Sequence, residues 1–204
     1  MLIADAQSAP GSLTLTATSS DQALVPNASI VLGGSGANRT VKVTPSVNRV
    51  GNANIMLMVS DGVASASDTF TLAVQLSAGG SWRQQHFGSM ANSGAAADGA
   101  DPDADGLSNL WERAFALDPH LPQLNPWPVA NRADGYLALR YRRSLAATDL
   151  TYQVLWSSDL ATWSESDVSD TRISGDAAAE TREGKVSILD STTPLFLHLR
   201  ITAP

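Results

Sequence analysis

Short stretches of alternating apolar and polar residues, separated by turn residues, constrain the fold of this 204-residue chain most strongly. In SLTLTATS (12–19), leucine and alanine alternate with serine and threonine, which is the pattern of a half-buried strand. Residues 28–46 predict two strands around a glycine-rich turn, and residues 53–76 predict a hairpin at Asp61-Gly62. Short strands between turns favour a β-sandwich over alternating strands and helices.

The middle of the chain, residues 77–131, follows a different pattern. SWRQQHF (81–87) predicts a short helix that Ser81 would cap. NLWERAFAL (109–117) has apolar residues at helical spacing, and the Asp-Pro pair that follows ends this second helix. The proline-rich LPQLNPWPV (121–129) then predicts an extended connector.

Strand patterns return in residues 132–204. GYLALRYRRS (135–144) alternates apolar side chains with tyrosine and arginine, and LFLHLRIT (195–202) places four apolar residues on one face. KVSILDS (185–191) is a further predicted strand. The sequence therefore predicts a mostly β protein. Two small β-sandwich domains, residues 1–76 and 132–204, are joined by a short helical connector, residues 77–131.

The acidic window DPDADGLSNLWE (101–112) matches the calcium-loop pattern D-x-[DN]-x-[DN]-G-x5-E at every position. Calcium is a hard cation that takes about six to eight oxygen ligands, so a loop that binds it must wrap around the ion. Gly106 supplies the sharp turn of this loop. The predicted ligands are the side chains of Asp101, Asp103, Asp105, Asn109 and Glu112 and the carbonyl of Leu107.

Other interpretations of the acidic residues remain open. In an acidic linker without an ion, neighbouring carboxylates repel by about 1 kcal/mol per close pair in water, and by more when they are partly buried. A cation removes that cost. Magnesium fits less well than calcium because it retains water and prefers a rigid octahedron. Asp5, Asp61 and Asp68 are candidates for a second calcium site.

Composition argues against several classes of function. A net charge of −7 and a pI near 4.7 argue against nucleic-acid binding, and no apolar run is long enough to span a membrane. The chain has no cysteine, which excludes disulfides and thiolate chemistry. His86, His120 and His198 lie in separate segments, and Asp167 and Asp170 are interpreted as polar loop residues. We therefore predict that the chain is not an enzyme.

The acidic window lies within a longer segment that resembles a known family. Residues 81–120 (SWRQQHFGSMANSGAAADGADPDADGLSNLWERAFALDPH) resemble a segment near the C-termini of large secreted bacterial proteins. That segment is akin to the calcium loops of thrombospondin type-3 repeats and dockerins. The family usually has E-Y-A-x-G where this chain reads WERAFAL (111–117), a change that keeps Glu112.

The flanking regions carry a weaker resemblance. Residues 12–74 resemble immunoglobulin-like or cadherin-like repeats of bacterial surface adhesins. Residues 135–164 and 196–202 are similar to the C-terminal β-domain that often follows such repeats. The resemblance implies immunoglobulin-like sandwiches, a calcium cofactor and a secreted or cell-surface location in bacteria.

The start of the chain departs from that family. Such repeats have another strand before IADAQSAPGSLTL (3–15), so the first domain is predicted to lack its first strand and to expose a sheet edge. The explanations are a fragment, a strand supplied by a neighbouring chain, or a complete fold. MLIADAQSAP (1–10) contains no visible signal peptide, which fits a fragment.

These observations predict a structural or adhesive component of a secreted or cell-surface protein, or of an extracellular assembly such as a filament. Calcium would rigidify the joint between the two sandwiches. The expected partners are other domains or copies of the surface protein, through strand donation or homopolymer formation. The alternative is a carbohydrate-binding module of a secreted polysaccharide-acting enzyme. It would use Trp127, Trp156 and Trp163 as a sugar-stacking platform, although core packing is the simpler role for Trp156.

Overall fold

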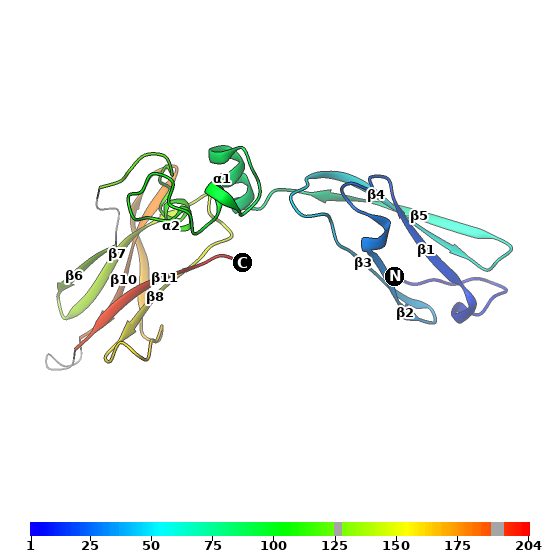
Figure 1. Cartoon of the computed structure of the whole chain (residues 1–204). Coiled ribbons are helices and arrows are strands. Elements are labelled where there is room, and N and C mark those ends of the chain that lie inside the picture. Colours follow the sequence, from blue (N-terminus) through cyan, green and yellow to red (C-terminus); the bar gives the residue numbers. More distant parts are fainter. Residues whose placement is uncertain (125–127, 189–193) are drawn as a thin grey trace. The chain divides into compact units, whose positions relative to one another are not determined.

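The computed structural model describes residues 1–124, 128–188 and 194–204. The fold is mostly β, in several small antiparallel sheets, as the strand patterns predict (Figure 1). The chain divides into two compact units, Met1–Leu76 (the first unit) and Ser77–Pro204 (the second unit). Within the described residues, no helix has the length and apolar character needed to cross a membrane.

The first unit contains two antiparallel sheets. Its elements are η1 (Pro10–Ser12), β1 (Thr14–Ser19), η2 (Asn27–Ser29), β2 (Ile30–Ser35), β3 (Asn38–Val43), β4 (Gly51–Ser60) and β5 (Ser65–Val74). One sheet has the strand order β1-β4-β5, and β2 pairs with β3 in the other. The hairpin predicted at Asp61-Gly62 is confirmed, because Ser60 at the end of β4 pairs with Ser65 at the start of β5.

Alternation along β4 gives the larger sheet a buried face and an exposed face. Met56 and Met58 are exposed, whereas Ala53, Ile55 and Leu57 are buried. The buried core of the unit comprises Leu24, Val25, Ile30, Ala53, Ile55 and Leu57. Because Ile30 belongs to β2 and Ile55 to β4, this core joins residues from both sheets.

The first unit has an open edge at β5. Met1–Ile3 runs along β3, where Leu2 forms an antiparallel bridge with Asn38. β1 and β5 are the two end strands of the larger sheet, and β5 pairs only with β4 among the described strands. Phe70 on β5 is 42% exposed. Donation by a neighbouring chain of the first strand that the sequence analysis expects to be missing stays a prediction.

The second unit contains two helices and two sheets. Its elements are α1 (Ala78–Phe87), η3 (Gly94–Ala96), α2 (Asn109–Phe115), β6 (Val129–Ala133), β7 (Tyr136–Ser144), β8 (Thr151–Ser157), β9 (Ser169–Gly175), β10 (Ala179–Ser187) and β11 (Phe196–Thr202). One sheet has the order β6-β7-β10-β9, and β11 pairs with β8 in the other. β7 supplies the buried Leu139 and Tyr141, as its alternation predicts.

The helical segment packs on these strands. Ala114 and Phe115 of α2 share one core with residues of β7, β8 and β11, so the segment that the sequence marks as a connector is part of the second compact unit. The predicted cap of α1 was wrong. Ser77 caps the helix, its side chain accepting from the Gly80 amide over 3.0 Å, and Ser81 lies inside the helix. α2 ends at Ala116, whose left-handed backbone (φ 55°) stops it before the Asp-Pro pair.

Sequence analysis did not predict two strands of the second unit, β6 and β9, and it misplaced a third, β10. β6 follows directly after the proline-rich connector, and β9 is polar and mostly exposed, so neither shows an apolar alternation. β10 spans Ala179–Ser187, so the strand predicted at 185–191 both begins and ends earlier than expected. Asp170 consequently lies on β9, and its assignment to a polar loop was wrong.

The two sheets of the second unit lie so close at Gly184 that adding a single methyl group there is expected to lower stability. A Cβ atom at Gly184 on β10 would lie 2.6 Å from Cγ2 of Val154 on β8. We therefore expect Gly184→Ala to lower the free energy of unfolding by about 1–3 kcal/mol through overpacking. Gly99→Ala is the control, because nothing lies within 4 Å of its added Cβ. Urea denaturation of both variants makes the comparison, and equal stabilities would contradict this packing.

Candidate metal centre

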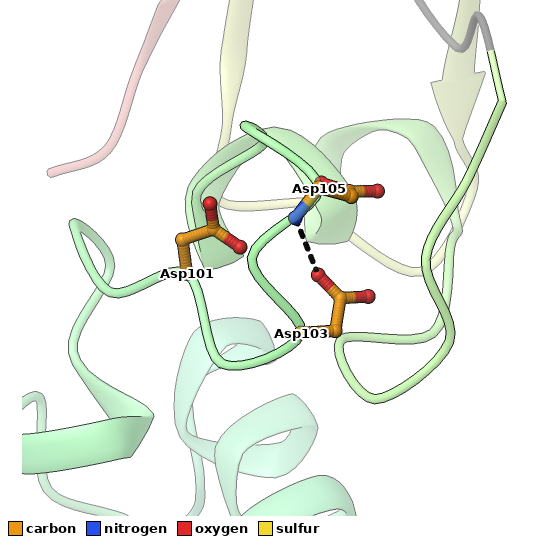
Figure 2. A group of neighbouring side chains, drawn as sticks. All are labelled: Asp101, Asp103 and Asp105. Carbon is orange, nitrogen blue, oxygen red and sulfur yellow. Dashed lines mark hydrogen bonds between the residues drawn. The ribbon is translucent and has the colours of Figure 1, made fainter.

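Three aspartates of the predicted calcium loop converge. One ligand oxygen from each of Asp101, Asp103 and Asp105 lies within 4.8 Å of the other two, close enough for the group to hold a metal ion. Figure 2 shows the three side chains on one tight turn of the chain. Left-handed backbone at Ala104 (φ 61°) and Gly106 (φ 93°) produces that turn. Among the described residues, these three aspartates form the one group of His, Asp or Glu side chains that is close enough to hold a metal ion.

Backbone amides hold these carboxylates in place. The Gly106 amide donates to Oδ2 of Asp101 over 2.9 Å. The Asp105 amide donates to Oδ1 of Asp103 over 3.3 Å, as Figure 2 shows. Asp105 accepts from the amides of Leu107 (2.8 Å) and Gln123 (2.7 Å), which ties the loop to the segment after α2. Oδ2 of Asp103 is buried without a hydrogen-bond partner. Backbone amides of the loop and of Gln123 thus fix these carboxylates, and a buried oxygen of Asp103 remains unpartnered.

The predicted ligand Glu112 has a buried carboxyl group without a hydrogen-bond partner. It lies on α2 and is fully buried, yet neither of its carboxylate oxygens has a hydrogen-bond partner. Burial, followed by the charges of Asp103, Asp105 and Asp101, raises the pKa of Glu112 to about 7. A buried carboxylate without a partner is costly, and nearby negative charges increase that cost. A cation among these side chains removes both penalties.

Asn109 and Leu107 complete the predicted set. The Asn109 side chain is fully buried, and its Nδ2 donates to the carbonyls of Ala95 (2.8 Å) and Ala97 (2.7 Å). These bonds fix the amide, and its Oδ1 atom is buried without a partner. Leu107 is also buried, with its side chain anchoring the loop. Every side chain among these candidate ligands offers oxygen, which is the donor type that hard cations such as calcium prefer.

The alternative acidic trio, Asp5, Asp61 and Asp68, is explained differently. All three line one cavity of about 440 Å³ in the first unit. However, Oδ1 of Asp5 accepts from two backbone amides, and Oδ1 of Asp61 accepts from two others. These bonds lower the pKa of both carboxyls, so Asp5 and Asp61 act as turn caps. A second calcium site at these three residues stays a prediction.

Two histidines that are far apart in the sequence come together in the structure. Nε2 of His120 lies 2.9 Å from the backbone carbonyl of His86, and the ring of His120 meets Phe87 edge-on. The sequence placed these histidines in unrelated segments, and no short-range pattern signals their meeting. The contact holds α1 to the segment after α2, which also contacts the loop through Gln123.

The tryptophans of the predicted sugar platform have mixed positions. Trp127 lies outside the described residues. Nε1 of Trp156 donates to the carbonyl of Ser166 over 2.9 Å, and Trp163 meets His198 edge-on at 5.3 Å between ring centroids. These contacts place Trp156 and Trp163 in the packing around β8 and β11, and sugar binding by either stays a prediction.

No protein-family model matches the chain, and no curated protein or solved structure shows significant similarity to it. The resemblance of residues 81–120 to secreted bacterial proteins therefore stays a prediction. The chemistry of the metal centre follows from its own side chains and their surroundings.

The raised pKa of Glu112 predicts how stability changes with pH when calcium is removed by a chelator. The pKa of this carboxyl rises from 4.5 to about 7 on folding. Folding therefore takes up a proton between these values, and the free energy of unfolding falls as the pH rises from 4.5 to about 7. Glu112→Gln stays neutral, so we expect that part of the slope to disappear. Denaturant titrations at several pH values measure it.

Glu183→Gln is the matched control, because Glu183 on β10 is paired with Arg140 at 2.6 Å, away from the loop. We expect Glu183→Gln to keep the slope between pH 4.5 and 7. A slope that is identical in wild type and Glu112→Gln would show that Glu112 is ionised in the folded protein without a metal, contrary to the geometry.

Proposed function

We propose that this chain is a non-enzymatic structural or adhesive component of a secreted or cell-surface protein, and that calcium bound in loop 101–112 stabilises it. The observation that carries the proposal is the Glu112 carboxylate. It is fully buried and has no hydrogen-bond partner beside three converging aspartates. An acidic linker would leave such groups in water, where they cost little. Glu112 is instead enclosed, and a divalent cation gives it a partner.

The proposed role of calcium is to attach the loop to the β core. Glu112 immediately precedes Arg113, and Ala114 and Phe115 of the same helix belong to the core of the second unit. An ion held by the aspartates and Glu112 therefore links the acidic loop to that core through α2. The ion is expected to contribute to the stability of the second unit, in the way that structural metals contribute to folding.

The adhesive part of the proposal is supported by the first unit. β5 forms a ten-residue edge strand, and Phe70 of this strand is partly exposed. Uncovered edges are able to accept a further strand from another chain. The middle of β5 is partly protected, because Oδ1 of Asp68 accepts the Thr69 amide over 2.8 Å. A partner strand is therefore expected to pair on either side of this point.

Thermal unfolding with and without calcium tests the proposed function. A ligand at a hundredfold excess over its dissociation constant stabilises the folded state by about 2.7 kcal/mol. We expect calcium to raise the melting temperature, and magnesium at the same concentration to raise it less. Asp103→Ala removes a predicted ligand and is expected to abolish the shift; alanine is used because the calcium-loop pattern also accepts asparagine at this position.

Asp167→Asn serves as the matched control, because it removes an equal charge from an exposed position of the same unit. Its left-handed backbone (φ 62°) also tolerates asparagine. This variant should keep the full calcium shift. A wild-type melting temperature that does not respond to calcium would contradict the proposed function.

A further inference from the structure

Arg113, the residue after Glu112, connects α2 to the start of α1 through Asp149. Arg113 is only 2% exposed, and its Nη1 atom lies 2.6 Å from Oδ1 of Asp149, in the connection between β7 and β8. Oδ2 of Asp149 accepts the amide of Gly79 over 3.0 Å. One buried ion pair therefore joins α2, the β7–β8 connection and the first turn of α1.

The fit around Gly79 is tight. A Cβ atom at this position would lie 3.0 Å from Nη1 of Arg113 and 3.1 Å from Oδ2 of Asp149. Arg113 is buried, Asp149 is partly buried, and the two groups are paired with each other, which limits their freedom to move aside. The first turn of α1 is thus seated directly on the ion pair, and it needs glycine for this approach.

The hydrogen bonds of that first turn have two different origins. The first backbone amides of a helix have no partner within the helix. Ser77 satisfies the Gly80 amide locally through its side chain, at 3.0 Å. The Gly79 amide depends on Asp149, which is 70 residues away in the sequence and is oriented by Arg113. The Gly79 amide therefore reports on the position of α2, whereas the Gly80 amide reports on the local cap.

We infer that Arg113 and Asp149 are positioning residues that couple calcium at the metal centre to the first turn of α1. This inference rests on the proposed function. Bound calcium holds Glu112 and so fixes α2, and Arg113 on the same helix then holds Asp149 against the Gly79 amide. With no ion, the buried carboxyl group of Glu112 has no partner, so α2 is held less firmly and the Asp149–Gly79 bond opens more often. The affected turn lies where the chain leaves the first unit, since that unit ends at Leu76.

Amide hydrogen exchange of the full chain, measured by NMR with calcium and with a chelator, tests this coupling. Calcium binding is measured on the same samples by titration calorimetry. We expect calcium to slow exchange at Gly79 by about 5- to 150-fold, the usual range of coupling between sites. Exchange at Gly80 should slow less, because its acceptor is local.

Arg113→Met separates the coupling from the binding. The variant keeps Glu112 and the aspartates, so it should still bind calcium, but the effect of calcium on Gly79 exchange should be lost. Gly79→Ala is a second variant in case Arg113→Met does not fold. It displaces the first turn from the ion pair and should also bind calcium without the exchange response at position 79. Glu183→Gln, which breaks the exposed pair with Arg140, should leave binding and exchange unchanged.

The possible failures are distinguishable. If the wild type binds calcium and exchange at Gly79 does not change, the coupling is wrong and the proposed function stands. If Arg113→Met retains the full exchange response, the coupling does not run through Arg113. If calorimetry detects no calcium binding to the wild type, both the proposed function and the coupling fail.

Discussion

The second unit is organised around one unfavourable electrostatic arrangement. Glu112 is enclosed without a partner while three aspartates converge beside it, and the backbone of the loop holds those aspartates in place. Such an arrangement loses stability unless positive charge enters it. The charged groups closest in sequence do not supply it, because Arg113 is committed to Asp149 on another side of α2. A cation from solution would supply it.

α2 has only seven residues and is too short to be stable by itself. It is held on three sides, by the acidic loop, by the Arg113–Asp149 pair and by the core around Phe115. These three contacts involve different parts of the sequence, namely the loop before α2, the β7–β8 connection and the strands that form the core. The segment between the two β-rich regions is consequently more than a linker, because it forms the part of the second unit where distant segments meet.

Sequence alone predicted the local features well. Alternation located β1 to β5 and β7, and the spacing of the acidic residues identified the group of aspartates that converges in the structure. It did not predict features that depend on distant contacts. β6 and β9 are strands because they pair with β7 and β10, and their own residues carry little apolar pattern. No sequence pattern distinguishes Gly79, yet it is buried against Arg113 and Asp149.

The same limit applies to the metal centre. Spacing pointed to Glu112, but not to its complete burial or to its unpartnered oxygens. The Gln123 amide that holds Asp105 carries no side-chain signal at all. These contacts arise only when the segment after α2 folds back on the loop, which no local pattern records.

The most direct test of the central claim is native mass spectrometry of the intact chain, exchanged into a volatile buffer with calcium or with magnesium. The arrangement of Glu112 and the aspartates predicts one calcium ion bound specifically per chain, with magnesium retained poorly. It also predicts that Glu112→Gln loses the bound calcium. A wild-type chain that retains no more calcium than Glu112→Gln would contradict the claim that this buried carboxylate is a metal ligand.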